Sequence, residues 1–143
     1  MNMSSTDFQG AVALAGRVLL AAIFFISGLS KIADPAATIN YLQAVGMPMP
    51  VLAYGLTVLL EVVGGLFLFL GYRVRPAAVA LAVFSVVAAA LFHNQLGDQN
   101  QFAHFLKNVS MSGGLLLMAA LGAGSLSFDS RRETASAPAH RIA

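Results

Sequence analysis

The chain has 143 residues, of which 58% are hydrophobic and only 10% are charged, and its formal net charge is +2. Soluble domains carry roughly 25% charged residues, so this composition excludes an ordinary soluble protein. Together with a mean hydropathy of +0.78, it favours an integral membrane protein over a buried soluble helical bundle. The absence of cysteine excludes disulfides, thiol redox chemistry and thiolate metal sites.

Four apolar stretches follow one another along the chain. Each is near the ~20 residues that a helix needs to cross a bilayer core, and backbone groups in lipid must be satisfied within each helix. The stretches therefore predict an all-α fold, an integral membrane four-helix bundle with short connections. The predicted spans are about 12–32, 51–71, 76–92 and 102–121. They form one domain over residues 1–129, and the polar tail at 130–143 is expected to be disordered.

The basic residues near the span ends are distributed unequally between the two sides of the membrane. By the positive-inside rule, both termini are expected in the cytoplasm. No basic cluster is interleaved with aromatic residues, so no nucleic-acid partner is expected. The first connection is the longest, and residues 38–45 within it are suited to a short interfacial helix. The cytoplasmic side would hold Arg17, Arg73, Arg75, Arg131, Arg132 and Arg141, and the other side Lys31 and Lys107.

Glu61 is the one acidic residue inside an apolar stretch. A carboxylate there costs several kcal/mol unless it finds a cation, takes up a proton or faces water. Helical spacing places Tyr54, Thr57 and Gly64 on the same face, so Glu61 is predicted to point into the bundle. Two interpretations stay open: a structural ion pair that fixes helix packing, or a working centre.

Two cations are candidate partners of Glu61. Arg17, on the first span, is placed by the rise per residue within about 5 Å of the same depth. Lys107 lies inside the fourth span, where an unpaired lysine is costly, and approaches from the outer side. Lys31, at the end of the first span, is expected to extend to the interface, as lysines at helix ends usually do.

Polar side chains crowd the outer half of the predicted bundle. They are either ordinary interface polarity or the lining of an outward-open cavity with Glu61 at its floor. Two histidines without a carboxylate at the same depth do not indicate a metal or haem site. In the cavity interpretation, Glu61, Arg17 and Lys107 carry the chemistry, and Lys31, His93, Asn94, His104 and Asn108 bind substrate.

Short motifs follow one another along the chain: Arg17, Gly28-x-x-Lys31, Glu61-x-x-Gly64-Gly65, Leu70-Gly71, Arg75-Pro76 and Lys107-Asn108. In this order they resemble the DoxX family of small four-helix bacterial membrane proteins. The closing segment at 122–129 resembles the family's Gly-Pro-Gly-x-x-Ser-x-Asp pattern, with Ala123 in place of the usual proline.

The resemblance implies a multi-pass protein of the bacterial inner membrane. Some relatives are linked to quinone-coupled sulfur or thiol oxidation, often as a small subunit beside a catalytic partner. The resemblance therefore predicts a redox-associated, quinone-linked subunit; the cofactor itself stays open, with a quinone as the candidate. Its expected partners are the lipid bilayer and an oxidoreductase or a second copy of the chain, and activity as an enzyme in its own right stays open. The alternatives are a non-enzymatic scaffold that anchors a partner protein, or a small transporter.

Overall fold

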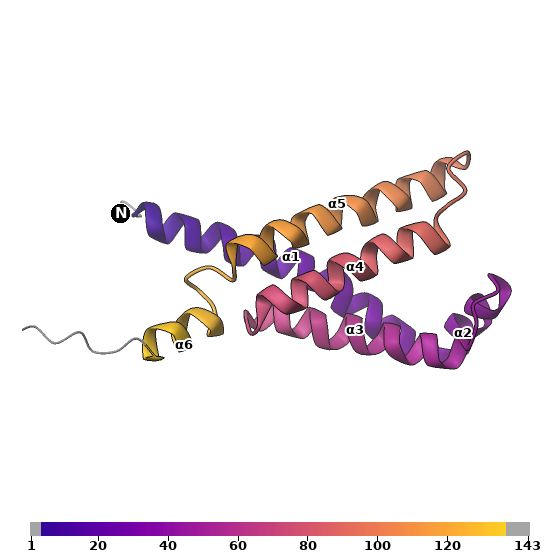
Figure 1. The fold of residues 1–143 in the computed structure, drawn as a ribbon, viewed down its shortest axis with the longest axis horizontal. Helices are drawn as coiled ribbons and strands as arrows, with labels where there is room; N and C mark the ends of the chain where they lie inside the picture. Colours follow the sequence, from indigo (N-terminus) through magenta and orange to yellow (C-terminus); the bar gives the residue numbers. More distant parts are fainter. Residues whose placement is uncertain (1–3, 137–143) are drawn as a thin grey trace, which may run out of the picture.

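The computed structural model describes residues 4–136 of the protein, and this part is all-helical, as predicted (Figure 1). The four long helices cover the predicted spans to within one residue. They are α1 (Ser5–Ala33), α3 (Pro50–Leu70), α4 (Val74–Phe92) and α5 (Gln99–Leu121). Two short helices, α2 (Pro35–Ala44) and α6 (Phe128–Ser136), lie at opposite ends of the bundle (Figure 1).

Local sequence signals set the ends of the helices. Asp34 separates α1 from α2, because its side chain accepts a hydrogen bond from the Ala37 N–H at 3.0 Å while Pro35 opens the new helix. Asp98 caps α5 in the same way, through the Gln101 N–H at 2.8 Å. Gly71 ends α3 in the left-handed conformation, with φ of 71°.

The long helices form two antiparallel pairs. α1 packs mainly against α3, and α5 packs mainly against α4; α3 and α4 join the pairs. Figure 1 shows α4 and α5 rising away from α3 toward the end of the molecule that carries α2. The bundle is therefore wider at the α2 end, which the sequence predicts to be the outer end, than at the α6 end.

Two glycines explain the close contact between α1 and α3. A Cβ atom at Gly65 would lie 3.0 Å from the backbone nitrogen of Phe25, and one at Gly28 would lie 3.2 Å from the backbone nitrogen of Val62. Such distances leave no room for a side chain, so the two backbones touch here. This contact fixes the register of α1 against α3.

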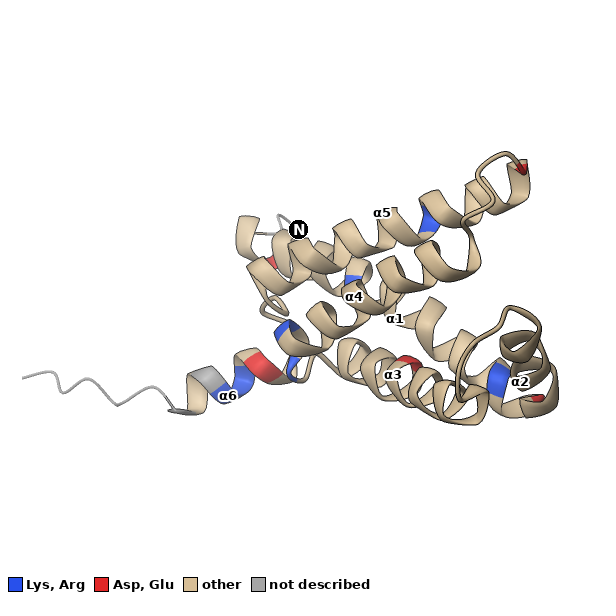
Figure 2. Ribbon diagram, turned by 45° about the vertical axis from the view of Figure 1, so that its right-hand side comes forward, with Lys and Arg blue, Asp and Glu red and all other residues tan. Residues whose placement is uncertain are grey.

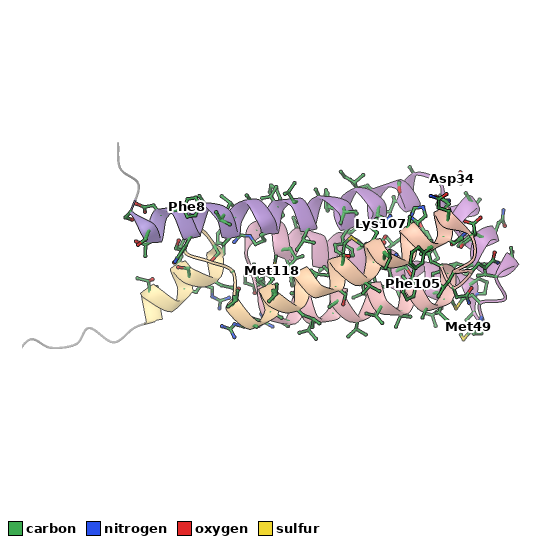
Figure 3. All side chains as sticks on the ribbon, turned by 90° about the horizontal axis from the view of Figure 1, so that it is seen from above. Phe8, Asp34, Met49, Phe105, Lys107 and Met118 are labelled. Atoms are coloured by element: carbon green, nitrogen blue, oxygen red, sulfur yellow. The ribbon has the colours of Figure 1, made fainter. Side chains whose placement is uncertain are left out.

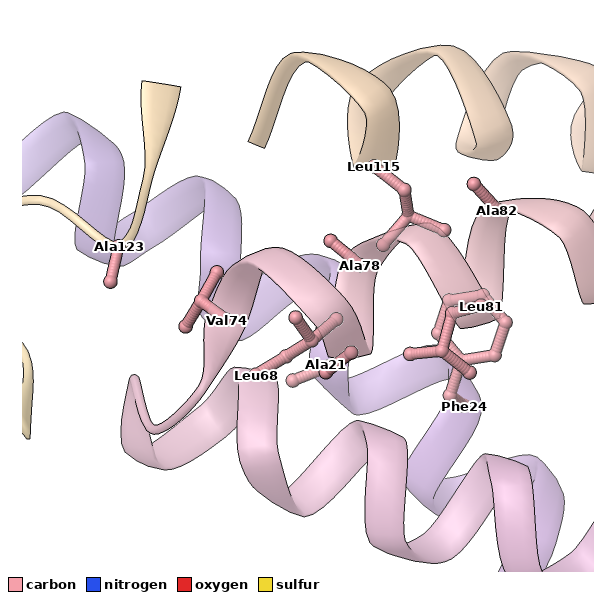
Figure 4. Packing of buried hydrophobic residues seen from close by; sticks show 10 residues of the cluster. Ala21, Phe24, Leu68, Val74, Ala78, Leu81, Ala82, Leu115 and Ala123 are labelled. Carbon is pink, nitrogen blue, oxygen red and sulfur yellow. The ribbon is translucent and has the colours of Figure 1, made fainter. Parts of the chain in front are cut away.

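The hydrophobic core joins all four long helices in the middle of the bundle and at its narrow end (Figure 4). Small side chains on α1 and α4 alternate with leucines from the neighbouring helices, so the layers interdigitate. The central members are Ala21, Phe24, Leu68, Val74, Ala78, Leu81, Ala82 and Leu115.

Three helices of the described chain are long and apolar enough to cross a membrane: α1, α3 and α4. Large apolar side chains cover their outward faces; Leu19 and Val83, for example, are 73% and 59% exposed. The 23-residue α5 is long enough as well, but polar residues occupy its first half. It packs against α4 and exposes Leu117 and Leu121. That α5 crosses the membrane as the fourth span stays a prediction.

Helix α6 covers residues that the sequence analysis assigned to the polar tail. It runs through Ser136, and residues 137–143 lie outside the described part of the chain. Figure 2 shows basic residues gathered around α6 and the adjoining start of α4, at the end opposite α2. The placement of both termini in the cytoplasm stays a prediction.

Candidate functional site

Glu61 forms a buried ion pair with Lys31. The Lys31 Nζ donates hydrogen bonds to Glu61 Oε2 at 2.8 Å and to Oε1 at 3.1 Å. Ser27 lies between the two: its hydroxyl accepts from Lys31 Nζ at 2.7 Å and donates to Glu61 Oε1 at 3.2 Å. Glu61 is 5% exposed, so its charge is balanced almost entirely by these two side chains of α1.

The prediction that Arg17 or Lys107 pairs with Glu61 was wrong: Lys107 contacts His104 instead, and the vertical offset between α1 and α3 explains why Arg17 does not reach Glu61. Glu61 of α3 and Gly28 of α1 lie side by side, at the same level of the bundle. Glu61 comes eleven residues after the start of α3, whereas Gly28 comes only five residues before the end of α1. At 1.5 Å per residue, α3 thus projects about 9 Å beyond α1. Arg17 precedes Gly28 by eleven residues, so it lies about 16 Å too deep along α1.

Lys31 is held inward by the same offset, contrary to the expectation that it extends to the interface. Helix α2 packs against the projecting part of α3 and covers the end of α1. The Tyr54 hydroxyl of α3 donates to the Lys31 carbonyl at 3.3 Å. Ser27, four residues before Lys31 and therefore on the same face of α1, holds its ammonium.

The Lys31–Glu61 pair lines a cavity of about 350 Å³ between the two helix pairs. Its wall includes the aromatic side chains Phe24, Phe84 and Phe92, and the ring of Tyr41 on α2 lies 5.9 Å from that of Phe92 on α4, which narrows the wide end. Every helix from α1 to α5 contributes. The lining residues are Ile23, Phe24, Ser27, Lys31, Thr38, Tyr41, Leu42, Thr57, Glu61, Phe84, Ala88, Phe92, His93, Lys107, Asn108 and Met111.

A second polar group lies on the α4–α5 side of the cavity. The rings of His93 and His104 stack with centroids 5.0 Å apart, and His93 Nδ1 is 2.8 Å from Gln101 Oε1. Lys107 Nζ lies 3.1 Å from His104 Nδ1, which therefore accepts its hydrogen bond, and Asn108 donates to the His104 carbonyl at 3.0 Å. Figure 3 shows Lys107 in the half of α5 nearer to Asp34 and Met49.

Five of the predicted site residues thus meet in one cavity: Glu61, Lys31, His93, Lys107 and Asn108. The other three do not line it. His104 contacts it through Lys107 and His93; Asn94 is exposed just beyond α4; Arg17 lies toward the α6 end. Within residues 4–136, no group of three or more His, Cys, Asp or Glu side chains is placed to hold a metal ion.

Sequence reasoning missed the contribution of α2 and of Ser27. Tyr41, Thr38 and Leu42 line the cavity from α2, yet its sequence gives only a weak apolar pattern. Ser27 had a usable signal, because its spacing to Lys31 places both side chains on one helical face.

Arg17 connects the segment after α5 to the rest of the bundle. Its side chain is 2% exposed, and its two terminal nitrogens donate to the carbonyls of Ala123 and Leu126 at 2.5 and 2.8 Å. Asp129 completes the connection: its two carboxylate oxygens accept the N–H groups of Arg73 and Val74 at 2.8 and 2.9 Å. Arg17 and the closing motif at 122–129 therefore build the narrow end of the bundle.

Replacing Arg17 by glutamine should detach this segment. The carbonyls of Ala123 and Leu126 lose charge-assisted hydrogen bonds, which corresponds to about 2–3 kcal/mol of unfolding free energy. Hydrogen exchange at residues 123–127 should accelerate, while exchange around Glu61 should not change. Arg131→Gln, at an exposed residue of α6, is the matched control. Unchanged exchange at 123–127 in Arg17→Gln would contradict this role.

Comparison with known proteins agrees with this architecture. The DoxX family profile matches residues 12–94, from α1 to the end of α4. The inner membrane protein YqjF of Escherichia coli is 37% identical over 116 residues, covering 81% of this chain and 88% of YqjF. The Escherichia coli inner membrane protein YphA is 34% identical over 133 residues, covering 87% of this chain and 95% of YphA.

A more distant match is the ER-derived vesicles protein ERV29 of Saccharomyces cerevisiae, 25% identical over 93% of this chain but only 37% of ERV29. No solved structure matches. The family match includes Lys31 and Glu61 and ends before Lys107. The chain belongs to the DoxX family and is an inner-membrane protein.

Proposed function

We propose that this protein is a redox-associated membrane subunit that binds a quinone in the cavity between its two helix pairs. The observation that carries the proposal is the Lys31–Glu61 pair, an ion pair of the apolar bundle that lies in the wall of a cavity. An ion pair that served packing alone would not need an adjacent space. Ionisable residues within membrane segments commonly mark ligand or proton paths.

The cavity has the chemistry that a quinone requires. A quinone ring is flat and apolar and carries carbonyl oxygens at opposite edges. Phe24, Phe84 and Phe92 offer apolar faces to such a ring, while Lys31 and Lys107 offer donors from opposite sides. The volume of about 350 Å³ lies within the range of small-molecule sites, roughly 300–1,000 Å³.

The bundle also suggests a route by which a lipid-soluble ligand enters. α1 packs mainly on α3 and α5 mainly on α4, so the side between α1 and α5 is the least tightly packed. Ile23 of α1 and Met111 of α5 both line the cavity and face this side from the two pairs. A quinone dissolved in the bilayer would enter here, without crossing water.

Reduction of a quinone to a quinol consumes two electrons and two protons. The chain has no cysteine, so the electrons would come from an oxidoreductase partner bound to this subunit. The Lys31 ammonium and the Glu61 carboxylate, joined through Ser27, would exchange protons with the bound ring oxygens. The proposed role is thus binding and proton exchange.

Filling the cavity tests the proposal. Ala88 lines it from α4, whereas Ala22 lines an apolar groove on the outer side of α1 and α3. Ala88→Phe should weaken binding of decylubiquinone to the detergent-solubilised protein at least about tenfold, because the added ring takes the space of the ligand. Ala22→Phe adds the same ring elsewhere and should leave binding unchanged.

Binding can be measured by native mass spectrometry and by the ligand-dependent rise in melting temperature. Glu61→Gln should also weaken it, since the carboxamide cannot hold Lys31 in place. Equal binding by the Ala88→Phe and Ala22→Phe variants would place the ligand elsewhere. A wild-type protein that retains no quinone but co-purifies with a protein partner would favour the scaffold alternative.

A further inference from the structure

A second groove lies at the end of the molecule opposite the cavity around Glu61. This groove measures about 370 Å³ and runs between the start of α4 and the segment that follows α5. It shares no lining residue with the cavity around Glu61. Its lining is Arg73, Arg75, Pro76, Leu121, Gly122, Ala123, Gly124, Ser125, Ser127, Asp129 and Ser130.

The charge of the groove is positive in effect. Both oxygens of the Asp129 carboxylate already accept backbone N–H groups at the start of α4. Arg75, by contrast, has no hydrogen-bond or ion-pair partner among residues 4–136. Its guanidinium lies against the backbone, because a Cβ atom at Gly122 would be 3.5 Å from its Nη2 atom. A free guanidinium with Ser125 and Ser130 in the same groove is suited to a phosphate group.

The groove also adjoins the lipid-facing surface. Pro76 and Leu121 form its apolar edge, and Leu121 is 81% exposed. From there, exposed apolar side chains continue at helical spacing along both helices, with Val79 on α4 and Leu117 on α5. A ligand with a phosphate at one end and a hydrocarbon chain at the other would satisfy both parts.

We propose that this groove binds one anionic phospholipid, with the headgroup phosphate on Arg75 and an acyl chain along α4 and α5. Basic pockets between helices at a membrane surface are suited to acidic headgroups. Arg73, which also lines the groove, and the arginines of α6 add to the positive potential around it. The site would tie the α6 end of the bundle to anionic lipid, independently of the quinone cavity.

Native mass spectrometry of the protein released from nanodiscs tests this site. With equal amounts of phosphatidylglycerol and phosphatidylcholine, the wild type should retain one phosphatidylglycerol preferentially. Arg75→Gln should reduce that preference about fivefold, the effect of about 1 kcal/mol per basic residue at a membrane surface. Arg75→Lys, which keeps the charge, should retain part of it.

Arg131→Gln is the matched control, because it removes the same charge from α6 outside the groove. If Arg75→Gln and Arg131→Gln lose the preference for phosphatidylglycerol equally, the lipid is attracted by the overall positive charge and not by this groove, and the proposal is wrong. Equal retention of the two lipids by the wild type would also overturn it. Inorganic phosphate that stabilises the solubilised protein as much as phosphatidylglycerol would identify a free anion as the ligand instead. Helical content by circular dichroism confirms that each variant folds.

Discussion

Lys31→Met should destabilise the protein, because it leaves the Glu61 carboxylate inside the bundle without its counter-charge. The substitution removes the counter-charge of a carboxylate that is 5% exposed, and leaves it one hydrogen bond, from Ser27. Breaking a buried pair in this way costs about 3–5 kcal/mol. Because the Lys31 side chain is itself 23% exposed, we expect a loss below that range, about 2–3 kcal/mol. Unfolding in SDS, followed by circular dichroism, measures the loss.

A double-mutant cycle separates the pair from its surroundings. Lys31→Met combined with Glu61→Met removes both charges, and the double variant should recover most of the stability that Lys31→Met loses. The control cycle combines Arg17→Gln with Glu61→Gln; these two should add to within about 0.5 kcal/mol, because the side chains share no contact. Additivity between positions 31 and 61 would mean that the observed ion pair contributes nothing.

The partner of Glu61 marks the limit of what the sequence could predict. Hydropathy located the long helices, and helical spacing placed Glu61 on the inward face. Choosing among Arg17, Lys31 and Lys107 required the relative depth of α1 and α3, which depends on helix packing. The close contact at Gly28 and Gly65 sets that depth, and nothing in the hydropathy pattern records it.

The sequence predicted the polar side chains of the cavity but not the apolar side chains that complete its wall. Histidines, lysine and asparagine in the outer halves of two spans indicated a polar space, and three of them line it. Phe84 and Phe92 belong to an ordinary apolar stretch in the sequence and Tyr41 to the first connection. They line a common space only because the two helix pairs diverge. The proposal of a quinone rests on this apolar wall as much as on the charges.

The two ends of the bundle differ in how they are held. At the α6 end, Arg17 and Asp129 bind backbone groups, so their removal loosens a loop. At the α2 end, Lys31 and Glu61 bind each other beside an open space, which is where we propose that the ligand binds. The register of α1 against α3 is what keeps this second pair together.

Gly65→Leu tests that dependence and should be the most damaging apolar substitution. Its first added carbon would lie 3.0 Å from the Phe25 nitrogen and 3.3 Å from the Ala21 carbonyl oxygen, and neither backbone atom can move aside without moving α1. Overpacking costs about 1–3 kcal/mol where side chains can adjust. Since backbone must shift here, we expect about 3 kcal/mol or more.

Gly55→Leu is the matched control on the same helix, because nothing lies within 4 Å of a Cβ atom at Gly55. It should leave stability unchanged or raise it by about 0.5–1 kcal/mol, as a better helix former replaces glycine.

Gly65 lies one turn from Glu61, so separating the helices there should also lengthen the Lys31–Glu61 contact. Gly65→Leu should therefore weaken decylubiquinone binding, and Gly55→Leu should not. A Gly65→Leu variant that is as stable as the wild type but no longer binds decylubiquinone would show that the register matters for the site alone. A variant that keeps both its stability and its quinone binding would show that the glycine contact does not position Glu61.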